Sequence, residues 1–249
     1  MTGRSPALAL LILLLGAGIA FGAYSGTYTI MPTGGDFSSH DEASDSLMAY
    51  GVTGPCTLEM YTGTYTGQAY FSSPTWDSVE VIFKAASGQK PVVTNSSYPW
   101  YIYYADRITV DGVKTISTGS YGSYVYRSLH HKFLNSVVSA SSYGMYIYYS
   151  DTAEVSGCNI EAGSYGSRWY YAGMRTCVGN NINAPNSYGI YAYRVASGTY
   201  SYNDLFVNNM VFAGSGYGIY HYYHYYAKLY YNTIYSATSY AYYDYYGYS

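Results

Sequence analysis

This chain has 249 residues, and two of its aspartates have a spacing near that of a catalytic pair. Asp106 and Asp151 each lie eight residues after a tyrosine that opens a repeated phrase, Tyr98 and Tyr143 respectively. If the repeats stack at the usual spacing of strands, the two carboxylates lie two coils apart, about 9.6 Å. That distance is near the upper end of the range for the acid and base of an inverting glycoside hydrolase. Aspartate also stabilises turns through its own backbone, and the sequence leaves both interpretations open.

Polar side chains at neighbouring positions could assist such a pair. His130 and His131 fall in the repeat between the two aspartates, beside Leu129. Arg127 and Arg194 occupy the sixth position after a repeat tyrosine, where most other repeats have tyrosine. An arginine there would either stack on the neighbouring rings or carry a solvated surface charge.

Histidine and cysteine patterns give no metal site. His221 and His224 lack a third ligand, and we expect them to be inward and surface residues of one strand. Cys56, Cys158 and Cys177 are an odd number of cysteines without the spacing of a zinc site. We therefore assign no disulfide, and we predict neither a metal nor a cofactor.

Tyrosine dominates the composition, with 40 residues, whereas charged residues make up only 10%. Eleven Lys and Arg residues nearly balance 14 Asp and Glu residues. This balance argues against a nucleic-acid partner, which would call for a basic patch. The aromatic content argues against disorder. Because tyrosine packs well on a pleated, half-buried surface, the composition favours an all-β protein.

A repeat runs from residue 97 onward and accounts for the tyrosine excess. Each repeat opens on a Ser-Tyr-Gly phrase or a close variant, and the position of the opening tyrosine advances in steps of 23, 22, 22, 23, 29 and 23. The six extra residues of the fifth repeat fall around positions 196–204. The opening tyrosines are Tyr98, Tyr121, Tyr143, Tyr165, Tyr188, Tyr217 and Tyr240.

The residues after each opening tyrosine alternate, which predicts a strand. The second and fourth positions are mostly apolar and should point inward. The glycine that follows most opening tyrosines indicates a bend or a close approach of the backbone. The third and fifth positions are almost always tyrosine and should form an outward face. From this face we select ten candidate ligand-binding residues: Tyr101, Tyr103, Tyr124, Tyr126, Tyr146, Tyr148, Tyr191, Tyr193, Tyr220 and Tyr222.

A second apolar stretch follows in each repeat, with Asn or Gly at a tight turn in its middle. Asn180, Asn209 and Asn232 fall in one column, which predicts a ladder of amides. Two or three short strands in each repeat are typical of a parallel β-helix, here with coils of about 22 to 23 residues. Residues 97–249, and residues 143–160 above all, resemble the right-handed parallel β-helix proteins of the pectate-lyase-like superfamily. The resemblance implies a right-handed solenoid.

The region before the repeat divides into two parts. Residues 1–22 have a basic start, an apolar run too short to span a bilayer and small residues before a cleavage point, which predict a signal peptide. Residues 23–96 are expected to hold a capping helix and the first coils. Ser39 and Glu42 fit a capping box, Ala43, Leu47 and Tyr50 form an apolar stripe, and Gly51 ends the helix. Strands are expected over 56–61, 63–66 and 79–83.

Residues 36–68 resemble the opening of pectin-esterase-like proteins, but Gly67 stands where their pattern has glutamate. The segment that carries an esterase catalytic aspartate is also not found. The resemblance therefore extends to the fold and not to the esterase activity.

Four functions remain open for this chain, which we expect to be secreted or at the cell surface, and we favour a structural or binding role over an enzymatic one. The tyrosine face is structural or binds polysaccharide or a cell-surface glycan. The fold also hosts polysaccharide lyases and glycoside hydrolases, and a filament subunit is a further alternative. Because the last coil is incomplete, we expect a fragment or a chain that self-associates through its open C-terminal end. No span of the mature chain is expected to cross a membrane.

Overall fold

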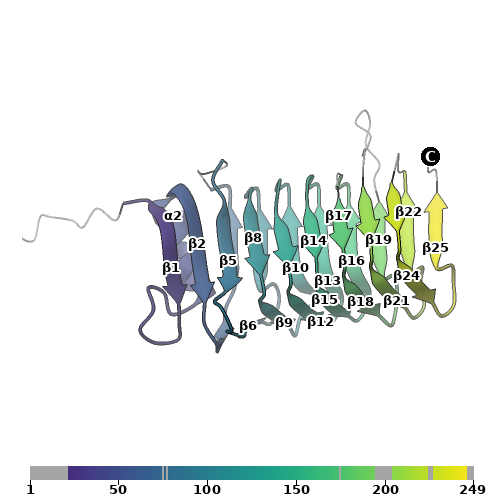
Figure 1. Cartoon of the computed structure of the whole chain (residues 1–249), viewed down its shortest axis with the longest axis horizontal. Helices are drawn as coiled ribbons and strands as arrows, with labels where there is room; N and C mark the ends of the chain where they lie inside the picture. Colours follow the sequence, from purple (N-terminus) through teal and green to yellow (C-terminus); the bar gives the residue numbers. More distant parts are fainter. Residues whose placement is uncertain are drawn as a thin grey trace, which may run out of the picture.

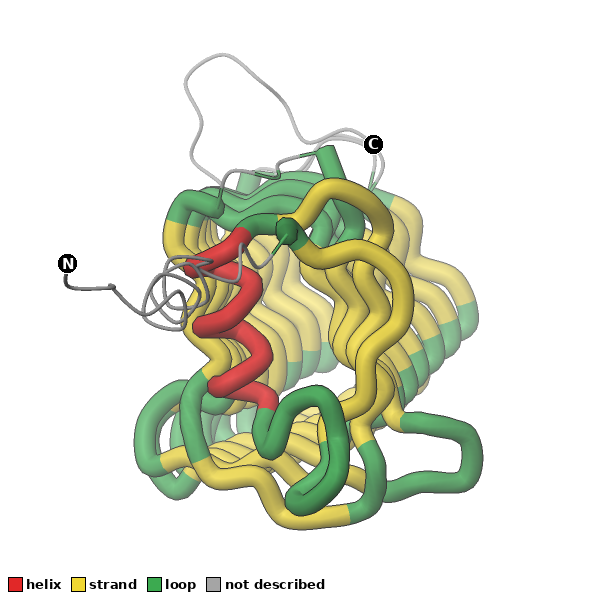
Figure 2. Tube along the Cα trace, turned by 90° about the vertical axis from the view of Figure 1, so that its left-hand side faces the viewer, coloured by secondary structure: helices red, strands yellow, loops and turns green. Residues whose placement is uncertain are grey.

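The computed structural model describes residues 22–74, 76, 78–173, 175–193, 204–223 and 227–245. These residues form one right-handed parallel β-solenoid of about eight turns (Figure 1). Seen from the N-terminal end, successive turns lie behind one another around a common axis (Figure 2). The predicted all-β, right-handed parallel fold is therefore confirmed.

Three sheets run along the solenoid, and every ladder in them is parallel. Sheet A consists of β1 (Tyr24–Ile30), β2 (Val52–Met60), β5 (Val81–Ala85), β8 (Ile108–Asp111), β11 (Lys132–Leu134), β14 (Glu154–Ser156), β17 (Thr176–Val178), β20 (Leu205–Val207) and β23 (Lys228–Tyr230). Sheet B consists of β3 (Gly63–Thr66), β6 (Pro91–Asn95), β9 (Lys114–Ser117), β12 (Val137–Ala140), β15 (Asn159–Ala162), β18 (Asn181–Ala184), β21 (Met210–Ala213) and β24 (Thr233–Ser236). Sheet C consists of β4 (Ala69–Ser72), β7 (Trp100–Tyr103), β10 (Tyr121–Tyr126), β13 (Tyr143–Tyr148), β16 (Tyr165–Tyr170), β19 (Ile190–Tyr193), β22 (Ile219–Tyr222) and β25 (Tyr242–Tyr245).

The length of a coil follows from the register of sheet A. Phe133 pairs with Val155, which lies one repeat further along the chain, as the sequence predicts. Earlier coils are longer, because Leu58 pairs with Phe83 and Phe83 pairs with Val110. The predicted coil length therefore holds in the repeat region except for the long fifth repeat, where Cys177 pairs with Phe206, and it does not hold before the repeat.

The core is a single column of inward side chains, and alternation along each strand produces it. In β13, Met145 and Ile147 are fully buried, while Tyr146 and Tyr148 face outward and are half-buried. Gly144, in the column after the opening tyrosine, has no room for a side chain. A Cβ there would lie 2.3 Å from Ile160 Cγ2 and 2.5 Å from the carbonyl oxygen of Gly166. Of the bend and the close backbone approach that the sequence offered for this glycine column, Gly144 shows the close approach.

A buried asparagine ladder closes the turn between sheets A and B. Asn180 Nδ2 donates to Asn209 Oδ1 at 2.9 Å, and Asn209 Nδ2 donates to Asn232 Oδ1 at 2.9 Å. Each Oδ1 also accepts the backbone N–H of the residue one coil earlier, as between Asn209 and Asn180 at 3.1 Å. The residue before each asparagine adopts a positive φ, 65° at Gly179 and 54° at Asn208. The predicted amide ladder and left-handed turn are confirmed.

The capping helix α2 (His40–Tyr50) lies across the N-terminal end, in the position that a sheet C strand takes in later coils (Figure 2). Ser39 Oγ accepts the Glu42 N–H at 3.3 Å, and the helix ends at Gly51, where φ is 81°. The Glu42 carboxylate accepts the N–H of Ser38 rather than of Ser39, so only half of the predicted capping box forms.

The prediction of the buried face of α2 was wrong at one residue. Ala43 and Leu47 are buried as expected, but Tyr50 is 46% exposed. His40 and Ser44 complete the buried face instead, because the helix packs onto β4 and Trp100. The His40 and Trp100 rings lie 5.3 Å apart.

The three strands expected in the first coils are present as β2, β3 and β5, but β2 begins four residues earlier than expected and β5 is shifted by two residues toward the C-terminus. Strands β1, β4 and β6 were not anticipated from the sequence. The predicted signal peptide, apart from Gly22, lies outside the described residues.

Candidate functional site

The outer surface of sheet C carries the predicted tyrosine columns, which we call the tyrosine face. Each strand presents its opening, third and fifth positions outward, and the corner that follows presents the sixth. All ten candidate ligand-binding tyrosines lie on this face and are half-buried. Tyr70, in β4, extends the third column one coil before the repeat, with its ring 5.2 Å from that of Tyr101. The register of the sheet therefore brings together residues that are one repeat or more apart in the sequence.

The opening tyrosines stack along most of the solenoid. The ring centroids of Tyr121 and Tyr143 lie 4.8 Å apart, and their planes are inclined by 9°. Tyr143 and Tyr165 lie 5.0 Å apart with planes inclined by 6°. This spacing follows the rise of one strand per coil, so the parallel register alone brings the rings into contact.

The fifth-position tyrosines form a second column, with a change of packing in its middle. Tyr103 and Tyr126 stack at 5.0 Å, whereas Tyr126 and Tyr148 are inclined by 60°. Stacking resumes at Tyr170 and Tyr193, whose centroids are 4.7 Å apart.

Arg168 replaces tyrosine in the third column and packs like one. Its guanidinium carbon lies 5.2 Å from the ring centroid of Tyr146 and 5.5 Å from that of Tyr191, in the coils on either side. The rings of Tyr143, Tyr165 and Tyr170 surround it at 5.2 to 5.6 Å. Arg168 Nη1 also donates to the Tyr143 hydroxyl at 3.3 Å. The arginine therefore continues the column by cation–π contacts.

The sixth position forms a corner column in an unusual backbone conformation. Tyr104, Tyr149, Tyr171 and Tyr223 have φ between 49° and 56°, and Arg127 has 48°. A positive φ at a bulky residue is rare. Here it turns the sixth side chain onto the face of the fifth, so that the rings of Tyr148 and Tyr149 lie 4.4 Å apart.

Arg127 stacks on rings within this corner column, which is one of the two possibilities that the sequence left open for it. Its guanidinium carbon lies 5.5 Å from the Tyr104 centroid and 5.3 Å from the Tyr149 centroid. Arg194 and His224 lie outside the described residues, as does Tyr246, the tyrosine at the sixth position of the last repeat.

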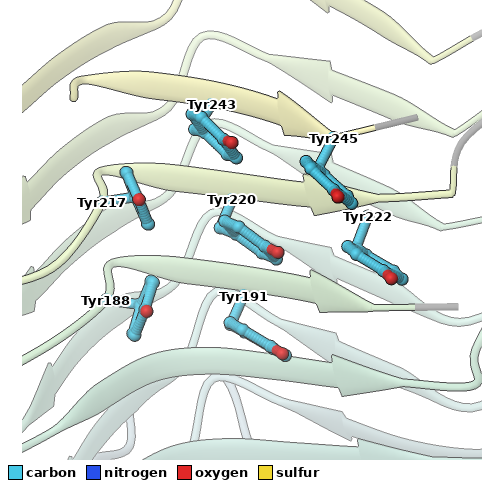
Figure 3. Close-up of a pocket in the computed structure, with 7 residues that line it drawn as sticks. All are labelled: Tyr188, Tyr191, Tyr217, Tyr220, Tyr222, Tyr243 and Tyr245. Carbon is cyan, nitrogen blue, oxygen red and sulfur yellow. The ribbon is translucent and has the colours of Figure 1, made fainter. Parts of the chain in front are cut away.

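Because stacked rings cover one another's faces, the tyrosine face presents mainly ring edges and hydroxyl groups. Figure 3 shows the rings of Tyr191, Tyr220 and Tyr243 inclined alike, with their hydroxyl ends on the same side. A shallow hollow of about 460 Å³ lies among them and four further tyrosines. Burial among neighbouring rings raises the pKa of Tyr220 to about 12 and raises the pKa of Tyr191 as well. Both hydroxyls are therefore protonated at neutral pH and can donate and accept hydrogen bonds.

The two candidate catalytic aspartates hold neighbouring coils together. Asp106 Oδ1 accepts the Leu129 N–H at 2.6 Å, and Asp151 Oδ1 accepts the Gly173 N–H at 2.6 Å. These bonds fit the turn interpretation, except that the partner is the next coil and not the aspartate's own backbone. Asp106 also lines a shallow hollow of about 390 Å³ with Tyr104 and Arg127. A catalytic role for the pair remains a prediction.

The histidines beside these aspartates differ in their environments. His131 is fully buried, and burial lowers the pKa of its imidazole to about 4. His130 is exposed. His221 is buried as expected for an inward residue, with its ring 4.9 Å from that of Phe206. Cys56, Cys158 and Cys177 are all buried free thiols. In the part of the chain that the structure describes, no three His, Cys, Asp or Glu side chains gather as metal ligands would.

A buried ion pair inside the solenoid was missed by the sequence interpretation. Arg175 and Asp204 are both fully buried, and Arg175 Nη2 pairs with Asp204 Oδ2. The Arg175 N–H also donates to Asp204 Oδ1 at 2.9 Å. The repeat contained the information needed to predict this pair. Arg175 lies immediately before β17 and Asp204 immediately before β20, so the two residues occupy equal positions in neighbouring coils. The extra residues of the fifth repeat hid this correspondence.

Comparison with known proteins supports the fold. The chain resembles the crystal structure of the pectin methylesterase from Aspergillus niger in deglycosylated form, with a TM-score of 0.50 and 14% identity over 92% of this chain and 91% of that one. A penultimately deglycosylated form of that enzyme gives a TM-score of 0.49 at 13% identity over the same shares. At this identity the likeness shows the fold alone. No curated protein matches the chain.

Among the described residues, no helix has the length and apolar character needed to cross a membrane. The family model for the right-handed β-helix region matches residues 101–249, which are more than half of the sequence. The chain therefore belongs to the right-handed β-helix family.

Proposed function

We propose that this protein is exported and binds polysaccharide along its tyrosine face. The observation that carries the proposal is the set of tyrosine columns parallel to the solenoid axis, which repeat once per coil. Centroid separations of 5.0 Å between Tyr191 and Tyr220 and 5.6 Å between Tyr220 and Tyr243 make the array regular. An extended polymer whose own hydroxyl groups repeat along its length has the matching symmetry.

The ligand would not stack flat on the tyrosine rings. Stacked rings have little free face, so the ligand would contact ring edges and receive hydrogen bonds from the phenol hydroxyls. The hollow, whose lining also includes Tyr188, Tyr217 and Tyr222, offers room for such a ligand (Figure 3). Apolar ring edges beside polar hydroxyls are the mixture that a sugar surface complements.

Export is the part of the proposal that rests on the sequence. Residues 1–22 have the charge, apolar run and small residues of a signal peptide. A polysaccharide ligand would then be met outside the cytoplasm.

The proposal is tested by removing hydroxyl groups without removing rings. We expect the variant with Tyr191→Phe and Tyr220→Phe to lose about tenfold in affinity for the retained polysaccharide, equivalent to about 1.4 kcal/mol. Affinity electrophoresis in gels that contain different polysaccharides measures the loss. The matched control is Tyr235→Phe, because Tyr235 lies on sheet B, is 57% exposed and also stacks on a neighbouring ring, that of Phe212.

The melting temperature separates binding from a purely structural role. Equal melting temperatures for the double variant and the wild type, with weaker retention in the gel, support binding. If no polysaccharide retards the wild-type protein, or if the double variant is retarded as strongly as Tyr235→Phe, the face serves only to stabilise the coils.

A further inference from the structure

Two pairs in the fifth-position column have the shortest ring separations between successive coils among the described residues of the tyrosine face. The centroids of Tyr170 and Tyr193 are 4.7 Å apart, with planes inclined by 8°. Those of Tyr193 and Tyr222 are 4.6 Å apart, with planes inclined by 11°. The two members of each pair lie a full repeat apart in the sequence. All three are half-buried, so their outer edges reach the solvent.

We propose that this column is a site of oxidative coupling, in which a haem peroxidase with hydrogen peroxide joins tyrosines of successive coils as dityrosine. A phenol that loses one electron and one proton gives a delocalised radical, and two such radicals couple through the ring carbons beside their hydroxyls. A ladder of phenols in contact is therefore a ladder of coupling partners. This inference is independent of polysaccharide binding.

The reaction balances for each pair. The peroxidase removes one hydrogen atom, as an electron and a proton, from the hydroxyl of each tyrosine. The two radicals form one carbon–carbon bond between the ring carbons beside the hydroxyls. Each of those carbons then releases its hydrogen as a proton while the phenoxyl oxygen takes one up, which restores both phenols. The two electrons and two protons removed reduce one hydrogen peroxide to two waters.

Ring contacts across the face allow a radical to reach the column from elsewhere. The rings of Tyr191 and Tyr193 lie 6.1 Å apart, and those of Tyr170 and Tyr171 lie 4.4 Å apart. A radical on one phenol can pass to its neighbour by taking the neighbour's hydrogen atom, without a change in the number of radicals. An oxidant that reaches any edge of the face can thus oxidise Tyr193.

Tyr231 provides the comparison that separates contact from exposure. It is 86% exposed, more than any other large hydrophobic side chain that the structure describes. No ring contact joins it to another described residue. If exposure alone governed the reaction, Tyr231 would be the main site, and its products would join separate molecules.

The test oxidises the dilute protein with haem peroxidase and hydrogen peroxide, then maps dityrosine-linked peptides by mass spectrometry. We expect products within one chain that link Tyr170 to Tyr193 and Tyr193 to Tyr222. Tyr193→Phe keeps a ring in the column but removes the phenol, so both products should fall to background. Tyr231→Phe should leave them unchanged.

Three outcomes would overturn the proposal. They are the absence of dityrosine, dityrosine only between molecules and through Tyr231, and in-chain products that link only tyrosines outside the fifth-position column. The melting temperature of Tyr193→Phe is measured alongside, so that loss of the fold is not mistaken for loss of coupling.

Discussion

The buried amide of Asn209 should be among the largest single contributors to the stability of the solenoid. Its Oδ1 accepts the Asn180 N–H at 3.1 Å, and its Nδ2 donates to the Cys177 carbonyl oxygen at 2.8 Å. Asn209→Ala removes both partners inside the core. An unsatisfied buried polar group costs about 1–3 kcal/mol, so we expect the free energy of unfolding to fall by roughly 4 kcal/mol.

A serine at the same position should recover part of this loss. Ser136, two coils before Asn180 in the same column, accepts the Val113 N–H at 3.2 Å and donates to the Leu134 carbonyl oxygen at 2.7 Å. Asn209→Ser can accept the Asn180 N–H in the same way but cannot reach the Cys177 carbonyl oxygen. Because one of the two unsatisfied groups is satisfied again, we expect a loss of about 2 kcal/mol.

Urea unfolding followed by circular dichroism measures these differences, and Asn183→Ala is the matched control. Asn183 is exposed on β18, so its replacement should change the free energy of unfolding by less than about 0.5 kcal/mol. A loss below about 1 kcal/mol for Asn209→Ala would refute the reasoning, because it lies under the cost of even one unsatisfied group. Equal losses for the alanine and serine variants would show that the ladder does not act through the backbone N–H.

Two further predictions concern the glycine column and the buried histidines. Gly144→Ala should destabilise the protein by about 1–3 kcal/mol, because the new Cβ would collide with Ile160 and with the carbonyl oxygen of Gly166. Thermal unfolding measures the effect, and an unchanged melting temperature would contradict the prediction. Burial lowers the pKa of His40 and of His131 to about 4 from 6.5 in the unfolded chain. Between these pH values the unfolded state therefore binds more protons than the folded state. The free energy of unfolding is at its full value above pH 6.5 and falls by roughly 3 kcal/mol per histidine as the pH drops to 4. Urea titrations at both pH values measure this loss, and a free energy of unfolding that is constant over this range would refute the prediction.

The repeat made most of the fold predictable. Tyrosine at the third and fifth positions, with apolar residues between, could only alternate across a strand, and Tyr146 and Ile147 lie where that alternation puts them. The asparagine column was predictable for the same reason, since residues at equal positions must stack. Strand β1 lies before the repeat begins, so no neighbouring copy of its pattern indicated it.

The conformation of the corner column could not be predicted from residue type. A left-handed backbone normally indicates Gly or Asn, and the chain places Tyr104, Tyr149 and Tyr171 there instead. The neighbouring coils fix this conformation, because each corner tyrosine N–H donates to a carbonyl oxygen of the next coil, as from Tyr149 to Tyr170 at 3.0 Å. Ladder bonds outside the local sequence thus override the local preference.

The buried face of helix α2 could not be predicted from the helix sequence alone, as the exposed Tyr50 shows. The apolar stripe of α2 was assigned from periodicity, but the face that a helix buries depends on what it covers. Trp100 belongs to β7, which follows the helix only after several intervening strands, and its ring contacts His40. No pattern within the helix carries that information.

The unequal length of the coils bears on how such a protein can change. Cys177 pairs with Phe206 and Phe206 pairs with Leu229 in unbroken register, although the first step spans the long fifth repeat and the second a repeat of ordinary length. The ladders of all three sheets thus continue past the inserted segment. The length of one coil can therefore change between two strands while the columns of tyrosine and asparagine on either side keep their stacking.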